Sequence, residues 1–156
     1  MSITPAETDN FTALCNKAEK IALRLIARAE QNSFRLTAKL ERRGFEAAVV
    51  KTVVSSLLDQ GLLNDERYAS LWLRSRLGMG RAHSPRHLLV SLGKRGIGRD
   101  FSRAAIKNTL DQETEYSLLL KYLEKMDIID IKGSIKQQLR SEGFSTEVIE
   151  RYYDSL

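Results

Sequence analysis

The sequence has one cysteine, two prolines and no long apolar run among its 156 residues. Cys15 alone excludes an intramolecular disulfide framework and indicates a reducing compartment. No apolar run approaches the ~18–20 residues of a membrane span, and residues 1–11 lack the basic and apolar regions of a secretory signal. The few prolines leave long stretches suited to helix. These absences predict a soluble, cytoplasmic, helix-rich protein, and 42% hydrophobic residues are enough to bury a core.

Positive charge is concentrated in the middle of the chain. Between Arg74 and Lys107 there are nine basic residues and one acid, Asp100, a net charge of +8. Residues 1–73 carry +1 and residues 108–156 carry −4, so the overall +5 hides a strongly basic centre. Such a field attracts polyanions or acidic protein surfaces.

The hydrophobic periodicity predicts nine helices and no strand. Apolar residues recur at three- and four-residue steps, and even the valines between residues 49 and 54 follow the helical period. Residues 1–9 are predicted to be a disordered leader, with the first helix running from about Asn10 to Gln31-Asn32. Further helices are predicted to be capped by Ser33, Asn64-Asp65, Ser84-Pro85 and Ser145. The later helices are predicted to turn these apolar residues inward: Phe101, Ala104, Ala105 and Leu110; Tyr116, Leu119, Leu120, Leu123 and Met126; Ile131, Ile135 and Leu139; Val148, Ile149, Tyr152 and Tyr153.

Three glycines, Gly44, Gly96 and Gly143, mark an internal repeat. A leucine lies four residues before each glycine, and an apolar residue lies eight before, one after and five after it. A glycine followed by an apolar residue is typical of a helix C-terminus, because the glycine takes the left-handed conformation. The spacing predicts an elongated, curved, all-α array of three three-helix repeats. Their predicted bounds are 10–61, 62–112 (the basic repeat) and 113–156; chance matching of leucines is the alternative.

A set of motifs between Asp59 and Ile97 stands out by its order and spacing: Gly61-Leu62-Leu63-Asn64-Asp65, Tyr68, Trp72, Arg76, Pro85, Leu88, Leu92, Gly96 and Ile97. Together these residues resemble the core of the RecX family, which consists of regulators of the bacterial RecA recombinase. The chain departs from the family pattern in having Asn64, Ser84 and Arg95 where the pattern has an acid, a glycine and a lysine, and in a longer connection between Leu77 and Ser84.

The resemblance implies a helical-repeat protein that lies along a RecA–DNA filament and is not an enzyme. It implies that binding competes with a second DNA strand or with LexA-type substrates, which lowers recombinase, ATPase and co-protease activity. It does not decide between this mode, capping of filament ends and disassembly. The implied partners are RecA and single- or double-stranded DNA without sequence preference, bound by a monomer with no cofactor.

The basic segment has three interpretations: solvated surface charge, contact with nucleic-acid phosphates, and contact with a protein filament that holds DNA. So many cations against one acid favour an anionic partner, because stable helix surfaces usually intersperse charges of both signs. The residues predicted to make this contact are Arg74, Arg76, Arg81, Arg86, Lys94, Arg95, Arg99 and Arg103.

Residues 84–106 also form a helix, a glycine turn and a helix, which leaves a free-standing helix-turn-helix DNA-binding regulator as the alternative function. The second helix offers Arg99, Ser102, Arg103 and Lys107, which suit phosphate better than base edges. A pure scaffold repeat protein is a third possibility, but it would not need the basic middle.

Other candidate sites are weak. His83 and His87 lack further metal ligands nearby, so no metal site is predicted and phosphate-facing or helix-surface histidines are favoured. Cys15 falls on an apolar stripe, as a buried hydrophobe would, and no paired carboxylates suggest catalysis. Trp72 and Tyr68 fit the core better than base stacking, whereas one of Tyr152 and Tyr153 is a possible exposed contact.

Overall fold

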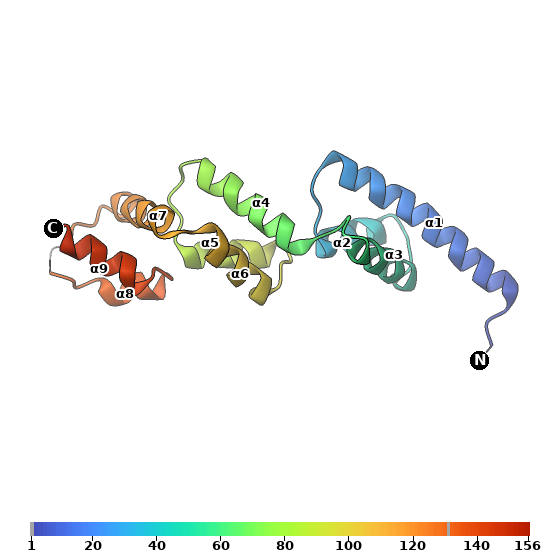
Figure 1. The fold of residues 1–156 in the computed structure, drawn as a ribbon. Helices are drawn as coiled ribbons and strands as arrows, with labels where there is room; N and C mark the ends of the chain where they lie inside the picture. The colour runs from blue at the N-terminus through green and yellow to red at the C-terminus, as the bar shows by residue number, and fades with distance from the viewer. Residues whose placement is uncertain (1, 131) are drawn as a thin grey trace. The chain divides into compact units, whose positions relative to one another are not determined.

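The computed structural model describes residues 2–130 and 132–156. These residues contain nine α-helices and no β-strand, which confirms the all-α prediction (Figure 1). None of the helices described is long and apolar enough to cross a membrane. Met1 of the predicted leader and Ile131 of the predicted eighth helix lie outside the described residues. The helices are α1 (Pro5–Arg28), α2 (Ser33–Arg42), α3 (Ala47–Asp59), α4 (Asp65–Gly78), α5 (Pro85–Lys94), α6 (Arg99–Thr109), α7 (Gln112–Lys125), α8 (Lys136–Ser141) and α9 (Thr146–Asp154).

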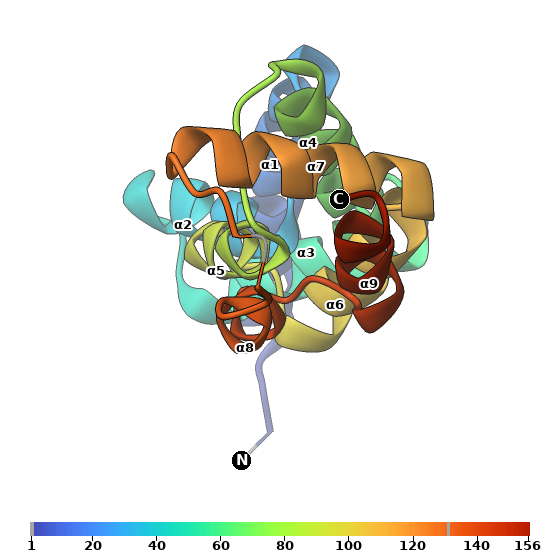
Figure 2. The same cartoon turned by 90° about the vertical axis from the view of Figure 1, so that its left-hand side faces the viewer.

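The chain folds as two compact units, one up to Tyr68 and one from Ala69 onward. In the first unit α1, α2 and α3 pack on one another around a core of aliphatic side chains, including the fully buried Leu36, Leu40 and Leu57. In the second unit α5 packs on α6, and α9 packs on both α7 and α8 (Figure 2). The division into three repeats and the elongated, curved arrangement stay predictions.

The three glycines of the sequence repeat end α2, α5 and α8 in the same way. The φ values of Gly44, Gly96 and Gly143 are 90°, 88° and 90°. These values lie in the left-handed region, which residues with a Cβ atom avoid. After each glycine an apolar residue donates its N–H back to the leucine carbonyl five residues earlier; Phe45 to Leu40, Ile97 to Leu92 and Phe144 to Leu139, at 3.4, 3.1 and 3.2 Å. This pattern is the Schellman motif, and it satisfies carbonyls that a helix end would leave free.

Three of the four predicted helix caps are confirmed. Asn64 accepts from the N–H of Arg67 at 2.9 Å, and the Ser84 and Ser145 hydroxyls accept from the third residues of α5 and α9. The prediction for α2 was wrong by one residue: Asn32 is the cap, because its side chain accepts from the N–H of Arg35 at 2.8 Å. Ser33, the first residue of α2, binds Asp65 instead.

The first and eighth helices differ from the prediction in length. The α1 helix begins at Pro5, so the predicted disorder and the start near Asn10 were wrong; a reciprocal capping box of Thr4 and Glu7 stabilises the earlier start. The predicted helix through Ile135 starts only at Lys136. The buried Asp130 carboxylate accepts from the Ile135 N–H at 3.0 Å and from the Tyr153 hydroxyl at 2.7 Å, which fixes this segment in a non-helical turn.

Several side chains face the opposite way from the periodicity prediction. In α6 the buried positions are Ser102 and Ala105, whereas Phe101 is 46% exposed and Ala104 is also exposed. In α7 Leu118 is buried, but Leu120 and Met126 are exposed. The prediction chose the buried face of each helix from side-chain hydrophobicity alone. In the structure, the packing of neighbouring helices determines which face is buried. Tyr152 is buried and Tyr153 is half-buried, so neither is a freely exposed contact.

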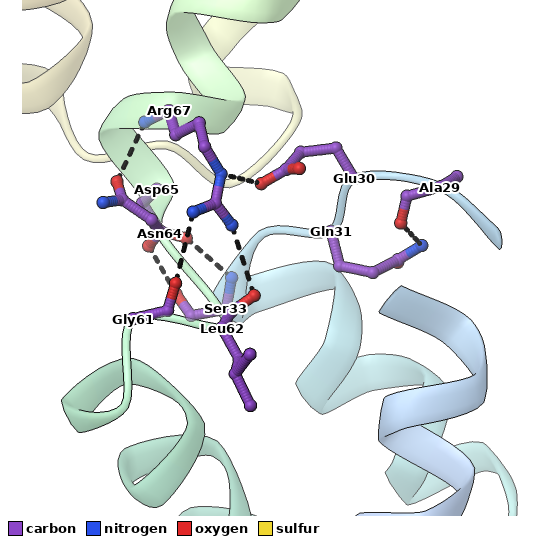
Figure 3. A network of polar contacts seen from close by, with 9 residues as sticks. All are labelled: Ala29, Glu30, Gln31, Ser33, Gly61, Leu62, Asn64, Asp65 and Arg67. Atoms are coloured by element: carbon purple, nitrogen blue, oxygen red, sulfur yellow. Dashed lines mark hydrogen bonds and ion pairs between the residues drawn. The ribbon is translucent and has the colours of Figure 1, made fainter. Parts of the chain in front are cut away.

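A polar network joins two turns within the first unit (Figure 3). The Asp65 carboxylate, at the start of α4, accepts from the Ser33 N–H at 2.7 Å and from its hydroxyl at 2.6 Å, at the start of α2. Arg67 binds Glu30 at 2.7 Å and donates to the carbonyls of Gly61 and Leu62, each at 3.2 Å. A carboxylate and a guanidinium thus satisfy helix-end groups that have no partner within their own helix.

The second unit repeats this use of carboxylates. Glu142 accepts from the Ser84 hydroxyl at 2.6 Å, and its carbonyl accepts from the Arg86 N–H at 2.9 Å, so the C-terminal end of α8 meets the N-terminal end of α5. Glu115 of α7 accepts from the Ser145 N–H at 2.6 Å at the start of α9.

Gly143→Ala should destabilise the protein more than Gly44→Ala. Both glycines have φ of 90°, so either alanine is strained by about 1–2 kcal/mol. A Cβ at Gly44 would meet nothing within 4 Å, but at Gly143 it would lie 3.1 Å from the Pro85 Cβ and 3.2 Å from the Arg86 backbone nitrogen. That crowding should add about 1 kcal/mol or more to the loss. Urea unfolding of both variants measures the difference, and equal losses would show that the contact of α8 with α5 is loose.

Candidate anion-binding site

The eight basic residues predicted as a site lie in the second unit, in four groups. Arg86, Arg99 and Arg103 line an open hollow of about 880 Å³ together with Lys107. Arg76 and Arg95 lie over the ring of Trp72. Arg81 lines a smaller hollow of about 300 Å³, and Arg74 and Lys94 are exposed without lining either hollow. We call the first of these the α5–α6 hollow.

Three cations of the α5–α6 hollow come from one face of α6. Arg99, Arg103 and Lys107 are spaced by four residues, and all three are exposed. Like charges at this spacing destabilise an isolated helix by about 0.2–0.5 kcal/mol per pair. The fourth cation, Arg86, comes from the N-terminal end of α5. Ser84 caps this helix and Pro85 is its first residue, so Arg86 lies in its first turn. The arrangement is unfavourable for the free protein, and an anionic partner would relieve the repulsion.

The charges that line the hollow are mostly positive. Among the described residues, Arg86, Arg99, Arg103 and Lys107 form no ion pair. Glu115 also lines the hollow, and its carboxylate accepts from the N–H and the hydroxyl of Ser145, at 2.6 and 3.1 Å. Four cations against one carboxylate leave the lining of the hollow with a net positive charge.

The wall of the hollow is apolar. Five aliphatic residues contribute to it: Leu89, Val90, Ile97, Ile106 and Leu110. Val90 is 48% exposed, although it lies on a helix whose Leu88 and Leu92 are fully buried. An open depression with aliphatic walls and cationic edges offers both hydrophobic and electrostatic contact to a ligand.

Trp72 has two guanidinium groups on its ring. The Arg76 and Arg95 guanidinium carbons lie 5.1 and 5.3 Å from the ring centroid, within the range of cation–π attraction. The ring is half-buried, between the fully buried core position that was predicted and an exposed stacking platform. These two arginines are held in place by the aromatic ring, which distinguishes them from the free cations of the hollow.

His83 and His87 stack in parallel, with ring centroids 4.9 Å apart and planes 7° from parallel. The His83 Nε2 atom is buried and, within the described residues, has no hydrogen-bond partner. The prediction that the histidines face phosphate or lie on the helix surface is therefore wrong for His83. Burial lowers the pKa of His83, and His87, Arg76, Lys125 and Arg81 lower it further by repulsion between like charges.

The described residues contain no cluster of three or more His, Cys, Asp or Glu side chains that could hold a metal ion. Cys15 is half-buried on α1, and burial raises the pKa of its thiol, which disfavours the reactive thiolate. What the four cations of the α5–α6 hollow offer chemically is binding of anionic groups.

Sequence reasoning did not assign the apolar wall, nor place Lys107 with the other site residues. Val90 was the available signal, because an aliphatic residue between the inward positions 88 and 92 belongs to the outer face of α5. The parts that α7, α8 and the turn before α9 contribute to the hollow had no signal in the sequence, since they depend on tertiary packing.

The fold and this site define a class: an all-α protein of short capped helices that carries an uncompensated basic surface. No family model matches the chain. A regulatory protein RecX from Treponema pallidum is 37% identical over 116 residues, which span 74% of this chain and 70% of the relative. A regulatory protein RecX from Syntrophotalea carbinolica is 30% identical over 141 residues, which span 85% of this chain and 91% of the relative. The chain belongs to the RecX family.

Solved structures agree on the fold. The crystal structure of RecX from Lactobacillus salivarius superposes with a TM-score of 0.69 at 21% identity, covering 93% of this chain and 99% of that one. A second crystal structure of a regulatory protein RecX gives a TM-score of 0.70 at 19% identity, covering 99% and 79% of the two chains. These matches confirm the all-α fold, while the division into three repeats stays a prediction.

His83 should make stability fall as the pH drops below about 6.5, its pKa in the unfolded chain. Its folded pKa is lowered, so the unfolded chain takes up the proton first and acid favours unfolding. His83→Gln should flatten the decrease in melting temperature between pH 7.5 and pH 5. Parallel pH profiles of wild type and His83→Gln would show that the half-buried imidazole of His83 does not drive the effect.

Proposed function

We propose that the protein binds the RecA–DNA filament and regulates it, mainly by inhibiting recombinase, ATPase and co-protease activity. Membership of the RecX family carries this proposal, because the motifs that first indicated the family are those of regulators of RecA. The four unpaired cations of the α5–α6 hollow support it, since a filament that holds DNA presents phosphates and acidic protein surfaces.

The basic surface of the second unit would be the principal contact. Each phosphate neutralised by Lys or Arg releases counterions, so this contact should be independent of DNA sequence and weaken with salt. A monomer with several contact surfaces along the filament would gain affinity from simultaneous engagement, without needing a strong single site. Occupation of the filament would then compete with a second DNA strand or with LexA-type substrates. Capping of filament ends and promotion of disassembly are the other possible directions.

The helix-turn-helix alternative is not favoured by the structure of α6. A recognition helix reads bases with side chains of its exposed first turns. Ser102 is 1% exposed and its hydroxyl lies 3.4 Å from the Ile97 carbonyl, so it cannot reach a base. The exposed polar residues of α6 that remain are mainly the cations Arg99, Arg103 and Lys107, which suit phosphate or carboxylate groups.

Replacing Arg99 and Arg103 together by Glu should impair regulation without unfolding the protein. Reversal of two exposed charges at the contact should raise the concentration for half-inhibition of RecA ATP hydrolysis on single-stranded DNA at least about tenfold. The melting temperature should not fall, because the change removes like-charge repulsion along α6. The measurement uses substoichiometric protein, at low and at physiological salt.

The matched control is Lys20→Glu with Arg24→Glu on α1. These residues are also exposed and four apart, so the change in net charge and helix geometry is the same. Equal effects of the two double variants would show that only net charge matters and that the hollow is not the contact. Absence of any inhibition by the wild type, together with sequence-specific duplex binding, would overturn the proposed function itself.

A further inference from the structure

The inward face of α6 carries smaller side chains than the corresponding faces of α3 and α9. Counting from the three glycines that end the preceding helices aligns these three helices. Six residues after the glycine stand Val50, Ser102 and Ile149, and nine residues after it stand Val53, Ala105 and Tyr152. All six side chains are buried, so the positions are equivalent in burial but not in volume.

This difference bears directly on the α5–α6 hollow. Ser102 lines the hollow, at the position where the other two helices carry a β-branched aliphatic side chain. Protein interiors are close-packed, and a residue that lacks bulk leaves either a collapsed contact or a space. Here a space of about 880 Å³ remains open, which is within the range of roughly 300–1,000 Å³ for ligand pockets.

We infer that the α5–α6 hollow binds an acidic amphipathic helix of a protein partner, with apolar side chains against its aliphatic wall and carboxylates at its four cations. The inference rests on the proposed function, which supplies the partner: a segment on the protein surface of the filament. A helix laid in a groove presents apolar residues every three to four positions and can place acids on either side of that stripe.

Charge and polarity together select this occupant. The hollow favours anionic groups because four cations line it: Arg86, Arg99, Arg103 and Lys107. Guanidinium groups bind carboxylates in a planar two-point geometry. Phosphates would satisfy the same cations but would leave the aliphatic wall unused. Binding of unpaired bases usually involves stacking on aromatic side chains, and none of the described residues that line the hollow is aromatic. A carboxylate-flanked apolar stripe uses both features.

The aliphatic wall provides the discriminating variant. Val90→Gln removes apolar surface without changing charge, at a residue that is 48% exposed and so is not needed for folding. We expect it to raise the concentration for half-inhibition of the RecA–single-stranded-DNA filament about tenfold. Leu71→Gln on α4 is the matched control, because Leu71 is 45% exposed and does not line the hollow; its effect should be less than about twofold.

Cross-linking identifies the occupant. A benzoylphenylalanine placed at position 90, and at position 71 as the control, is irradiated in the presence of the purified RecA filament on single-stranded DNA. The inference expects a cross-link from position 90 to a RecA peptide in which Asp or Glu residues flank an apolar helical stripe, and none to that peptide from position 71. A cross-link from position 90 to DNA, or to no component of the filament, overturns it.

Failure of the inference and failure of the proposed function have different signatures. If the wild type inhibits the filament and Val90→Gln inhibits equally well, the hollow is not the docking site and the proposed function stands. If the wild type neither binds nor inhibits the filament, the proposed function fails, and with it the identity of the partner assigned to the hollow.

Discussion

The structure depends on how short helices satisfy the polar groups at their ends. The nine helices of the described residues, most of them short, have many free N–H and carbonyl groups, and leaving one buried without a partner costs about 1–3 kcal/mol. Two devices recur in the described residues. Glycine turns close the C-termini of α2, α5 and α8, and carboxylates from other helices bind the serines that start α2, α5 and α9: Asp65 to Ser33, Glu142 to Ser84 and Glu115 to Ser145.

Much of the fold could be predicted, because these devices leave local traces in the sequence. Gly96 and Ile97 indicate a helix end wherever they occur together, and Ser84-Pro85 indicates a helix start. The predictions of helix boundaries were wrong where two neighbouring residues were both good caps, or where a residue distant in the sequence determined which of them acts as the cap. Asn32 and Ser33 are both good caps, and Asp65, thirty-two residues away, engages Ser33. The early start of α1 depends on a capping box formed by Thr4 and Glu7. The prediction missed it because the first residues of α1 carry no apolar stripe.

Three of the four cations of the hollow, Arg86, Arg99 and Arg103, were among the predicted residues, but their assembly into one hollow was not predictable. The charge count identified the basic segment, yet it treated eight cations as one surface. Cation–π contacts separate Arg76 and Arg95 from the group: Arg76 lies one helical turn after Trp72 in α4, and Arg95 meets the ring from the end of α5. The hollow itself needs Glu115 from α7 and Gly143 and Ser145 from the turn between α8 and α9, two later segments of the chain. No sequence pattern at residues 84–107 specifies that approach, since it results from tertiary packing.

Acidic residues link the capping of the helix ends to the charge of the α5–α6 hollow. The residues after Asp111 carry an excess of negative charge, which could have neutralised the basic segment within the second unit. Instead Glu115 and Glu142 are spent on serines at helix N-termini, where a carboxylate also meets the positive end of the helix dipole. Both carboxylates are thereby held at helix N-termini and form no ion pair with Arg86, Arg99, Arg103 or Lys107 among the described residues. The lining of the hollow, with four cations and Glu115, keeps a net positive charge, which gives it the capacity to bind an anionic partner.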